Sequence, residues 1–378
     1  MRLGIPLERA DHERRVAAVP ASVKAYTGWG WDVRVEAGAG TAAGFPDEAL
    51  VEAGATIVAD PAAAHDADLI LRVGPPTIDE ITLIPEGSVL ATFLDPFVSL
   101  DLVQALADRG VTAVAIEAVP RTTLAQAMDA LSSQANIAGY AAVLLAVDQS
   151  PKFPAMLVTA AGTIPPARAL VLGVGVAGLQ AIATFKRLGA VVHAYDIRPE
   201  TKEQVESLGA KFVEAPTQEM DEGGYAKEVD ADTAAKQQEV LASFVGDADL
   251  IVTTAQIPGR PAPRLITADM VTRMHAGSVI VDMAAASGGN VEGSRPGEAV
   301  DVDGVAIYGP LDLPSRVATD ASRMYGRNLQ ELVGRWRTDD GFAVNLDDEV
   351  AGPATITHAG QVVHPRTRAA MGLEEDAS

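Results

Sequence analysis

The sequence predicts an α/β fold with two parallel-sheet domains. Its 378 residues exceed the length of one typical domain and suggest about two. Short runs of β-branched and aliphatic residues alternate with alanine-rich segments of helical spacing. A glycine-rich turn near the middle of the chain separates one such run from a helical segment. This alternation is typical of parallel sheets covered by helices.

The first third of the chain carries the first set of strand and helix signals. Residues 33–36, 69–73 and 111–116 are short apolar runs of the strand type. Alanine-rich segments with helical spacing lie between them, such as residues 99–107. We therefore predict an α/β domain in this region.

A second α/β unit follows a long apolar helix, which is predicted over residues 134–147. Residues 162–166 interrupt the pattern, and a buried strand, a helix that ends at Gly189 and three further strands come next. The predicted bounds are 169–172 for the first strand, 179–188 for the helix, and 191–195, 250–253 and 278–281 for the other strands. The second domain is predicted to span residues 139–311.

The rest of the chain is more polar. Residues 216–238 contain glycine and many polar side chains, and we expect a surface excursion there. An ordinary solvated loop and a mobile functional loop both fit this composition. Towards the C-terminus the sequence predicts a helix over 318–336 and a hairpin-like tail over 355–363.

Composition excludes several classes of protein. The absence of cysteine excludes a disulfide scaffold, a thiolate zinc site and a thiol nucleophile. A net charge of −22 argues against nucleic acid as a partner and against unaided adsorption to an anionic membrane. The six histidines form no cluster, so no metal site is predicted. We find no signal peptide and no apolar run near 18 residues, and we expect a cytoplasmic chain without direct membrane insertion.

The glycine-rich turn has the spacing GxGxxG at Gly173, Gly175 and Gly178. Such a match is weak alone, but here it follows a predicted strand and opens a predicted helix. Asp196 comes 18 residues after Gly178, at the end of the next strand, where it can accept hydrogen bonds from a ribose. Its charge would repel a 2′-phosphate, although Arg198 argues mildly the other way. The sequence therefore predicts a Rossmann site for NAD(H), with an ordinary packing turn as the alternative.

Several longer segments resemble the signatures of one family, the NAD(H)-binding component of proton-translocating nicotinamide nucleotide transhydrogenase. They cover essentially the whole chain and are far more specific than a glycine-rich turn. The segments are residues 121–140, 202–209, 223–228, 253–263, 281–290 and 308–316.

This resemblance implies two Rossmann-like parallel-sheet domains separated by a cleft. Residues 1–138 plus 312–378 would form one composite domain, and residues 139–311 would form the Rossmann domain that binds NAD(H). It also implies a homodimer that works with a membrane component that conducts protons and with a soluble component that holds NADP(H). The chain would then be a separate subunit, peripheral on the inner face of the cytoplasmic membrane through its partners.

The resemblance also implies residue roles. The nicotinamide would be oriented by residues on one loop and helix start, namely Arg121, Gln126, Asp129 and Ser132. Without the resemblance, the solvent-exposed face of a helix would be the preferred interpretation of the last three of these, and the resemblance reverses that preference. The remaining cofactor-binding positions would be Gly173, Gly175, Val176, Ala177, Gly178, Asp196, Ile197, Arg198, Tyr225, Ala255, Gln256 and Met283. Tyr225 falls on the family's mobile loop, which closes over the nucleotide, and loop caps or strand-end turns are the alternatives for Gln256 and Met283.

Alanine dehydrogenase is a related family and the main rival. It shares an arginine at the position of Arg15, where that enzyme binds its substrate carboxylate. Its lysine, histidine and aspartate positions fall on Gly74, on the turn around Leu94 and on Ala286, so all three ionisable groups are missing here. Reduction of a 2-oxo acid to an amine moves protons and needs an acid–base group, whereas hydride transfer from NADH to NADP⁺ does not. The sequence thus favours transhydrogenation over an amino-acid dehydrogenase, and over an NAD(H) sensor without turnover.

Overall fold

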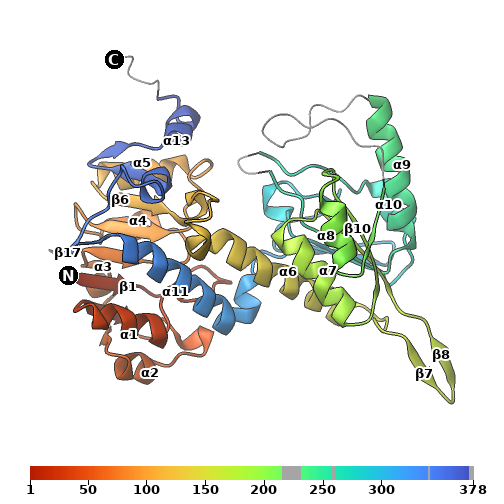
Figure 1. Cartoon of the computed structure of the whole chain (residues 1–378), viewed down its shortest axis with the longest axis horizontal. Coiled ribbons are helices and arrows are strands. Elements are labelled where there is room, and N and C mark those ends of the chain that lie inside the picture. The colour runs from red at the N-terminus through yellow and green to blue at the C-terminus, as the bar shows by residue number, and fades with distance from the viewer. Residues whose placement is uncertain (215–230, 258–259, 339–340, 374–378) are drawn as a thin grey trace. The chain divides into compact units, whose positions relative to one another are not determined.

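The structure is a computed structural model that describes residues 1–214, 231–257, 260–338 and 341–373. The chain divides into two compact units, each described below by itself. Unit 1 comprises Met1–Gln134 together with Pro314–Ser378, and unit 2 comprises Ala135–Leu313. Figure 1 shows the elements of both units with their labels.

Unit 1 is built on a mostly parallel sheet, confirming the predicted fold class for this region of the chain. In the described residues its strand order is β19-β18-β6-β5-β4-β1-β2-β3, with β18 antiparallel to β6 and β19 antiparallel to β18. The strand order reverses between β1 and β4, as in other open α/β sheets. The strands are β1 Arg2–Ile5, β2 Asp32–Glu36, β3 Thr56–Val58, β4 Leu69–Leu71, β5 Val89–Thr92, β6 Thr112–Ala115, β18 Thr355–His358 and β19 Gln361–Val362.

Helices cover both faces of this sheet. Leu69 and Leu71 of β4 point into the core cluster that includes Tyr325 of α11, whereas Ile70 points into the cluster that includes Leu106 of α5. Both faces of β4 are therefore buried, which explains its continuous apolar sequence. The helices are α1 Pro20–Gly28, α2 Asp47–Glu52, α3 Pro61–His65, α4 Ile78–Ile81, α5 Leu100–Asp108, α11 Ala318–Arg335, α12 Ala351–Ala354 and α13 Pro365–Ala370.

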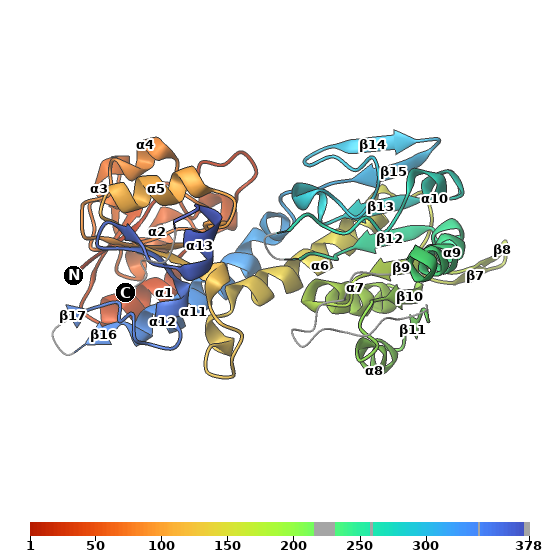
Figure 2. The same ribbon diagram turned by 90° about the horizontal axis from the view of Figure 1, so that it is seen from above.

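Unit 2 has the strand order of a Rossmann sheet. In the described residues the order is β11-β10-β9-β12-β13-β15-β14, with β14 antiparallel to β15 and the other pairs parallel (Figure 2). Leu170 and Leu172 of β9 share a core with Leu241 of α9 and Met270 of α10, while α7 packs against β9 and β10. The strands are β9 Arg168–Leu172, β10 Val191–Tyr195, β11 Lys211–Phe212, β12 Leu250–Thr253, β13 Val279–Asp282, β14 Ala299–Val302 and β15 Val305–Tyr308. The helices are α7 Val176–Arg187, α8 Thr201–Ser207, α9 Ala231–Asp247 and α10 Ala268–Thr272.

Most predicted elements are confirmed, and three expectations about where elements begin and end need correction. The helix after the glycine-rich turn begins at Val176 rather than at residue 179, because Gly175 is its N-cap and Gly178 lies in its first turn. The excursion predicted over 216–238 is too long, since α9 begins at Ala231. Residues 162–166, which we expected to interrupt the pattern, include a strand of a β-hairpin. The hairpin consists of β7 Leu157–Thr159 and β8 Gly162–Ile164 and projects from unit 2 (Figure 1).

The long apolar helix, α6, spans Ala130–Gln149. By length and composition it could cross a membrane, contrary to our expectation that no segment would meet this criterion. The apolar run within it, residues 137–147, is shorter than a membrane span, because serine, glutamine and asparagine lie among residues 132–136 near the start of the helix. One such helix is weak evidence for a span, since 56% of its window is buried and core helices of soluble proteins meet the same criteria.

Candidate functional site

The glycine-rich turn connects β9 to α7, and each of its three glycines is required for a different reason. Gly173 has a φ of +93°, and a Cβ there would lie 2.7 Å from Thr254 Oγ1. A Cβ on Gly178 would overlap the carbonyl oxygen of Gly173, so the helix could not pack so closely on the turn. A Cβ on Gly175 would meet no described heavy atom within 4 Å, so the backbone is open to a ligand there. Close packing at two glycines and an open approach at the third match what a pyrophosphate site requires.

The N-terminus of α7 is suited to an anion. Among the described residues no side chain caps this end of the helix, whose N-cap is Gly175. Its first-turn N–H groups, which include those of Val176 and Ala177, therefore remain available to an external acceptor. A Cβ on Gly139 of α6 would overlap the backbone of Ala177, so close packing of α6 fixes this end of α7.

Asp196 follows β10 directly and links this strand to the glycine-rich turn. Its carboxylate is 7% exposed, and Oδ2 accepts a hydrogen bond of 2.7 Å from Val174 N. Oδ1 accepts 2.9 Å and 3.0 Å hydrogen bonds from Arg198 N and Nε, and Arg198 Nη2 donates to Oδ2 at 3.0 Å. Its hydrogen bonds to Asp196 raise the pKa of Arg198 above the ordinary value. The predicted ribose acceptor is thus held in place, and the arginine that we counted against NAD(H) is paired with it.

The ends of β12 and β13 complete the edge of the sheet. Thr254 Oγ1 donates to Gly173 O at 2.9 Å, and Gln256 Nε2 donates to Met283 O at 3.1 Å. Asn290 braces the same turn, because its Oδ1 accepts from Ala255 N at 3.0 Å and its Nδ2 donates to Ala255 O at 2.8 Å. We did not predict this role of Asn290, although it ends one of the segments that carry the family resemblance.

The structure brings most of the predicted cofactor-binding residues to neighbouring strand ends of unit 2. In open α/β sheets ligands bind outside the carboxyl ends of the strands where the order reverses, which here is at β9 between β10 and β12. Tyr225 lies outside the described residues. The residues brought together are Gly173, Gly175, Val176, Ala177, Gly178, Asp196, Ile197, Arg198, Ala255, Gln256 and Met283.

The predicted nicotinamide-orienting residues lie in unit 1, just before and at the start of α6. Asp129 accepts two hydrogen bonds from Ser132, one from the backbone N at 2.8 Å and one from Oγ at 2.6 Å. Gln126 begins a separate 3₁₀ turn, Gln126–Met128, and both Gln126 and Arg121 are exposed. Gln126, Asp129 and Ser132 therefore do not lie on one helix. The alternative interpretation, in which they form one solvent-exposed helix face, does not fit the structure.

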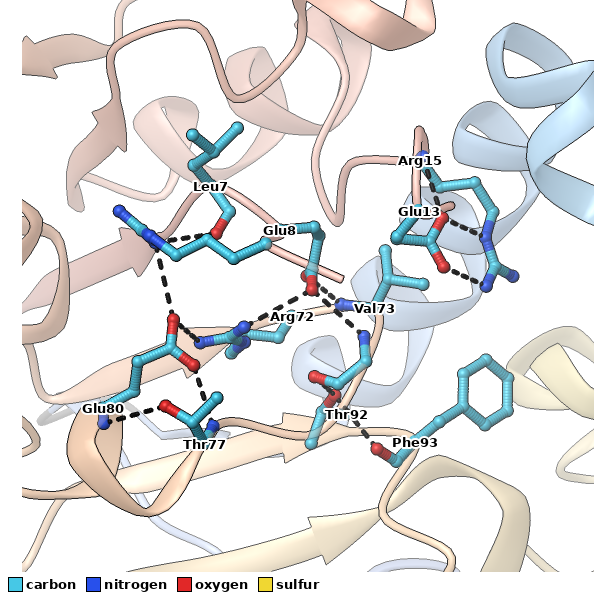
Figure 3. Close-up of polar contacts among 12 residues, drawn as sticks. Leu7, Glu8, Glu13, Arg15, Arg72, Val73, Thr77, Glu80, Thr92 and Phe93 are labelled. Atoms are coloured by element: carbon cyan, nitrogen blue, oxygen red, sulfur yellow. Dashed lines mark hydrogen bonds and ion pairs between the residues drawn. The ribbon is translucent and has the colours of Figure 1, made fainter. Parts of the chain in front are cut away.

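The arginine shared with alanine dehydrogenase is fully engaged by the chain itself. Arg15 Nε and Nη2 donate to the two carboxylate oxygens of Glu13 at 2.8 Å and 2.6 Å (Figure 3). Its Nη1 donates to Gln134 Oε1 at 2.8 Å, and the side chain is only 13% exposed. A bidentate carboxylate already occupies the fork that a substrate carboxylate would need.

The positions of the dehydrogenase's ionisable groups carry no acid or base here. Gly74 follows β4, where the backbone N of Val73 donates to Glu8 Oε1 at 2.6 Å (Figure 3). Arg72 pairs with Glu8 at 3.5 Å and with Glu80 at 3.0 Å, and burial raises the pKa of Glu8. The charged side chains of Glu8 and Arg72, which follow β1 and β4 in unit 1, are therefore buried and paired with each other.

The other two positions are also apolar. Leu94 is fully buried, and Ala286 lies in the 3₁₀ turn Ala285–Ser287 after β13. Among the described residues, no group of three or more acidic or histidine side chains could hold a metal ion.

Comparisons with known proteins agree with this geometry. The N-terminal-domain model of alanine dehydrogenase/PNT matches residues 4–138, and the C-terminal-domain model matches residues 142–365. The first portion of NAD(P) transhydrogenase subunit alpha from Rhodospirillum rubrum is 47% identical over 377 residues, which cover 97% of this chain and 98% of that protein. The crystal structure of transhydrogenase from Sinorhizobium meliloti is similar with a TM-score of 0.85 at 42% identity, over 97% of this chain and 99% of that one.

Alanine dehydrogenase is a more distant relative. The enzyme of Halomonas elongata is 31% identical over 384 residues, which cover 99% of this chain and 98% of that protein. The relatives support a transhydrogenase identity and an oxidoreductase role, and they imply that NAD(H) is bound. The chain belongs to the alanine dehydrogenase/PNT family.

Proposed function

We propose that this chain is the NAD(H)-binding subunit of a proton-translocating transhydrogenase, and that it passes hydride from NADH to NADP⁺ held on a partner component. One observation carries the proposal. A complete Rossmann site stands in a chain whose dehydrogenase positions, Gly74, Leu94 and Ala286, hold no acid or base. The 47% identity to the Rhodospirillum rubrum subunit supports the same choice.

The chemistry explains why such a site suffices. Bound NADH supplies the hydride, and no proton moves in the chemical step between two nicotinamides. The chain therefore has to bind the dinucleotide, orient its ring and exclude water, because alignment at about 3–3.5 Å dominates the rate of such a step. Acid–base groups would add nothing to that step.

In this proposal the residues of unit 2 hold the dinucleotide. The first-turn N–H groups of α7 bind the pyrophosphate, and Gly175 lets it approach the backbone. Asp196 accepts from the adenosine ribose and disfavours a 2′-phosphate through its negative charge. NAD(H) would then be preferred over NADP(H) on this chain.

The residues before α6 would orient the nicotinamide ring. Arg121 and Gln126 are exposed and can reach a ligand or a partner, whereas Asp129 is already fixed by Ser132. We propose that Asp129, Ser132 and Arg121 position the ring and that Gln126 faces the partner's nucleotide. Tyr225 would close over the bound dinucleotide.

The assembly proposed is a homodimer docked to a membrane component that conducts protons and to a component that holds NADP(H). The Rhodospirillum rubrum relative is named as a portion of a subunit alpha, which supports a multi-component enzyme. The β7–β8 hairpin supports the dimer, because two-stranded hairpins are marginal alone and this one exposes Leu157, Val158 and Ile164. The chain would lie on the cytoplasmic face of the membrane through these partners.

Two assays on the purified chain test the proposal. Mixed with an NADP(H)-loaded partner component, it should reduce a nicotinamide analogue at the expense of NADH. With NAD⁺ and L-alanine, or with NADH, pyruvate and ammonia, it should show no turnover. Turnover of a simple amino acid would overturn the proposal in favour of a dehydrogenase.

A further inference from the structure

In the described residues of the chain, the acceptor positions of Asp196 are already occupied. A carboxylate offers about four lone-pair positions for hydrogen bonds. Val174 N and Arg198 Nη2 use those of Oδ2, at 2.7 Å and 3.0 Å. Arg198 N and Nε use those of Oδ1, at 2.9 Å and 3.0 Å. A ribose that hydrogen-bonds to Asp196 must therefore replace one of these donors.

The four donors differ in how easily they can leave. Val174 N and Arg198 N belong to the backbone of the glycine-rich turn and of the strand end, and the fold holds both in place. The guanidinium of Arg198 sits at the end of a flexible side chain that is 39% exposed, although it also donates to Val174 O at 3.3 Å. The guanidinium is thus the donor that an incoming ligand can displace.

We propose that the side chain of Arg198 is an internal competitor for the ribose position on Asp196, and that NAD(H) binds by displacing it. The inference rests on the proposed function, in which Asp196 is the ribose acceptor. It assigns Arg198 a role opposite to that of an ordinary ligand residue: its ion pair preorganises Asp196 and at the same time weakens nucleotide binding. Release of the oxidised nucleotide would be assisted when the guanidinium returns.

The proposal predicts the sign of a binding change. When a binding-competent state is only partly populated, the apparent dissociation constant rises by the inverse of that fraction. Removal of the guanidinium should therefore tighten NADH binding. A simple charge argument predicts the reverse, because loss of a cation near an anionic dinucleotide should weaken binding.

The test is isothermal titration of the full chain with NADH at constant ionic strength. Arg198→Met keeps an unbranched apolar stem but lacks the guanidinium that donates to Asp196, and we expect roughly three- to tenfold tighter binding. Arg198→Lys keeps the charge without the planar fork, and it should give an intermediate increase. Arg187→Met removes an exposed arginine at the far end of α7 and controls for net charge, so it should not tighten binding.

A double variant separates this role from a general change in the site. In an Asp196→Ala background, Arg198→Met should no longer tighten NADH binding, because the two residues act through one contact. Weaker or unchanged NADH binding by Arg198→Met would overturn the inference and leave the proposed function standing. Failure of the unmodified chain to bind NADH would overturn the proposed function itself.

Discussion

Gly178 packs directly against the carbonyl oxygen of Gly173, leaving no room for a Cβ between the first turn of α7 and the end of β9. Gly175, midway between them in the same turn, has open space where its Cβ would lie. Neighbouring glycines therefore serve two separate needs, packing of the helix on the turn and access of a ligand to the backbone.

Alanine substitutions at these two glycines should separate stability from binding. We expect Gly178→Ala to lower the free energy of unfolding by about 1–3 kcal/mol, because the clash forces α7 away from the turn. Gly175→Ala should leave stability within about 0.5 kcal/mol but weaken NADH binding, since its Cβ would enter the space of the pyrophosphate. Urea unfolding and NADH titration measure both effects. Normal NADH binding by Gly175→Ala would show that the pyrophosphate does not bind at this turn.

The carboxylate of Asp196 is expected to set nucleotide choice. Loss of a hydrogen bond between the ribose and a charged acceptor costs about 1.5–3 kcal/mol. Asp196→Ala should therefore weaken NADH binding by roughly ten- to a hundredfold, with a smaller effect on NADPH. Equal affinities of the unmodified chain for NADH and NADPH, measured by titration, would contradict the assignment.

The pair formed by Asp129 and Ser132 should stabilise the start of α6. Asp129 accepts from the Ser132 amide in the manner of an N-cap, so Asp129→Ala is expected to cost about 1 kcal/mol of unfolding free energy. Asp148→Ala, at an exposed position near the other end of α6, is the matched control and should cost nothing, because a negative charge there is unfavourable. Equal losses in both variants, measured by urea unfolding, would show that Asp129 does not cap the helix.

Gln126 should act in alignment rather than in NADH binding. Gln126→Asn keeps the amide and shortens its reach by one methylene, and the side chain is exposed, so folding should be normal. Small misplacements of reacting groups can lower rates by about a hundredfold, and we expect a loss of that size in hydride transfer to the partner. NADH affinity should be nearly unchanged. Stopped-flow transfer at the normal rate would leave Gln126 as a solvated surface residue.

Local sequence signals were sufficient for several elements that have a buried face, although the equally buried strands β1 and β5 were not predicted. The strand before Gly173, the turn and the strand that ends at Tyr195 were each recognisable from apolar runs and glycine spacing. The hairpin strand Leu157–Thr159 was not, because all three of its residues are exposed and the strand has no core-facing pattern. The strand Ala299–Val302 was also not predicted, because none of its four residues is buried.

The sequence could indicate candidate site residues, which the structure places at neighbouring strand ends of unit 2, but it could not predict the contacts among them. Gly173, Gly178 and Asp196 follow a spacing that physical chemistry explains, so the sequence alone could indicate them. The ion pair between Asp196 and Arg198 depends on side-chain geometry that a spacing of two residues does not determine. Likewise, Asn290 braces Ala255 across 35 positions of the chain, a contact that exists only once the sheet has formed.

The central claim is that hydride passes directly from NADH on this chain to NADP⁺ on a partner. The most direct measurement uses NADH carrying deuterium at the transferred C4 position, mixed in ordinary water with the chain and an NADP⁺-loaded partner component, with the product analysed by mass spectrometry. Direct transfer predicts that the deuterium appears in NADPH without loss to solvent, since no protein acid or base takes part in the step. Unlabelled NADPH, or no NADPH at all, would contradict it.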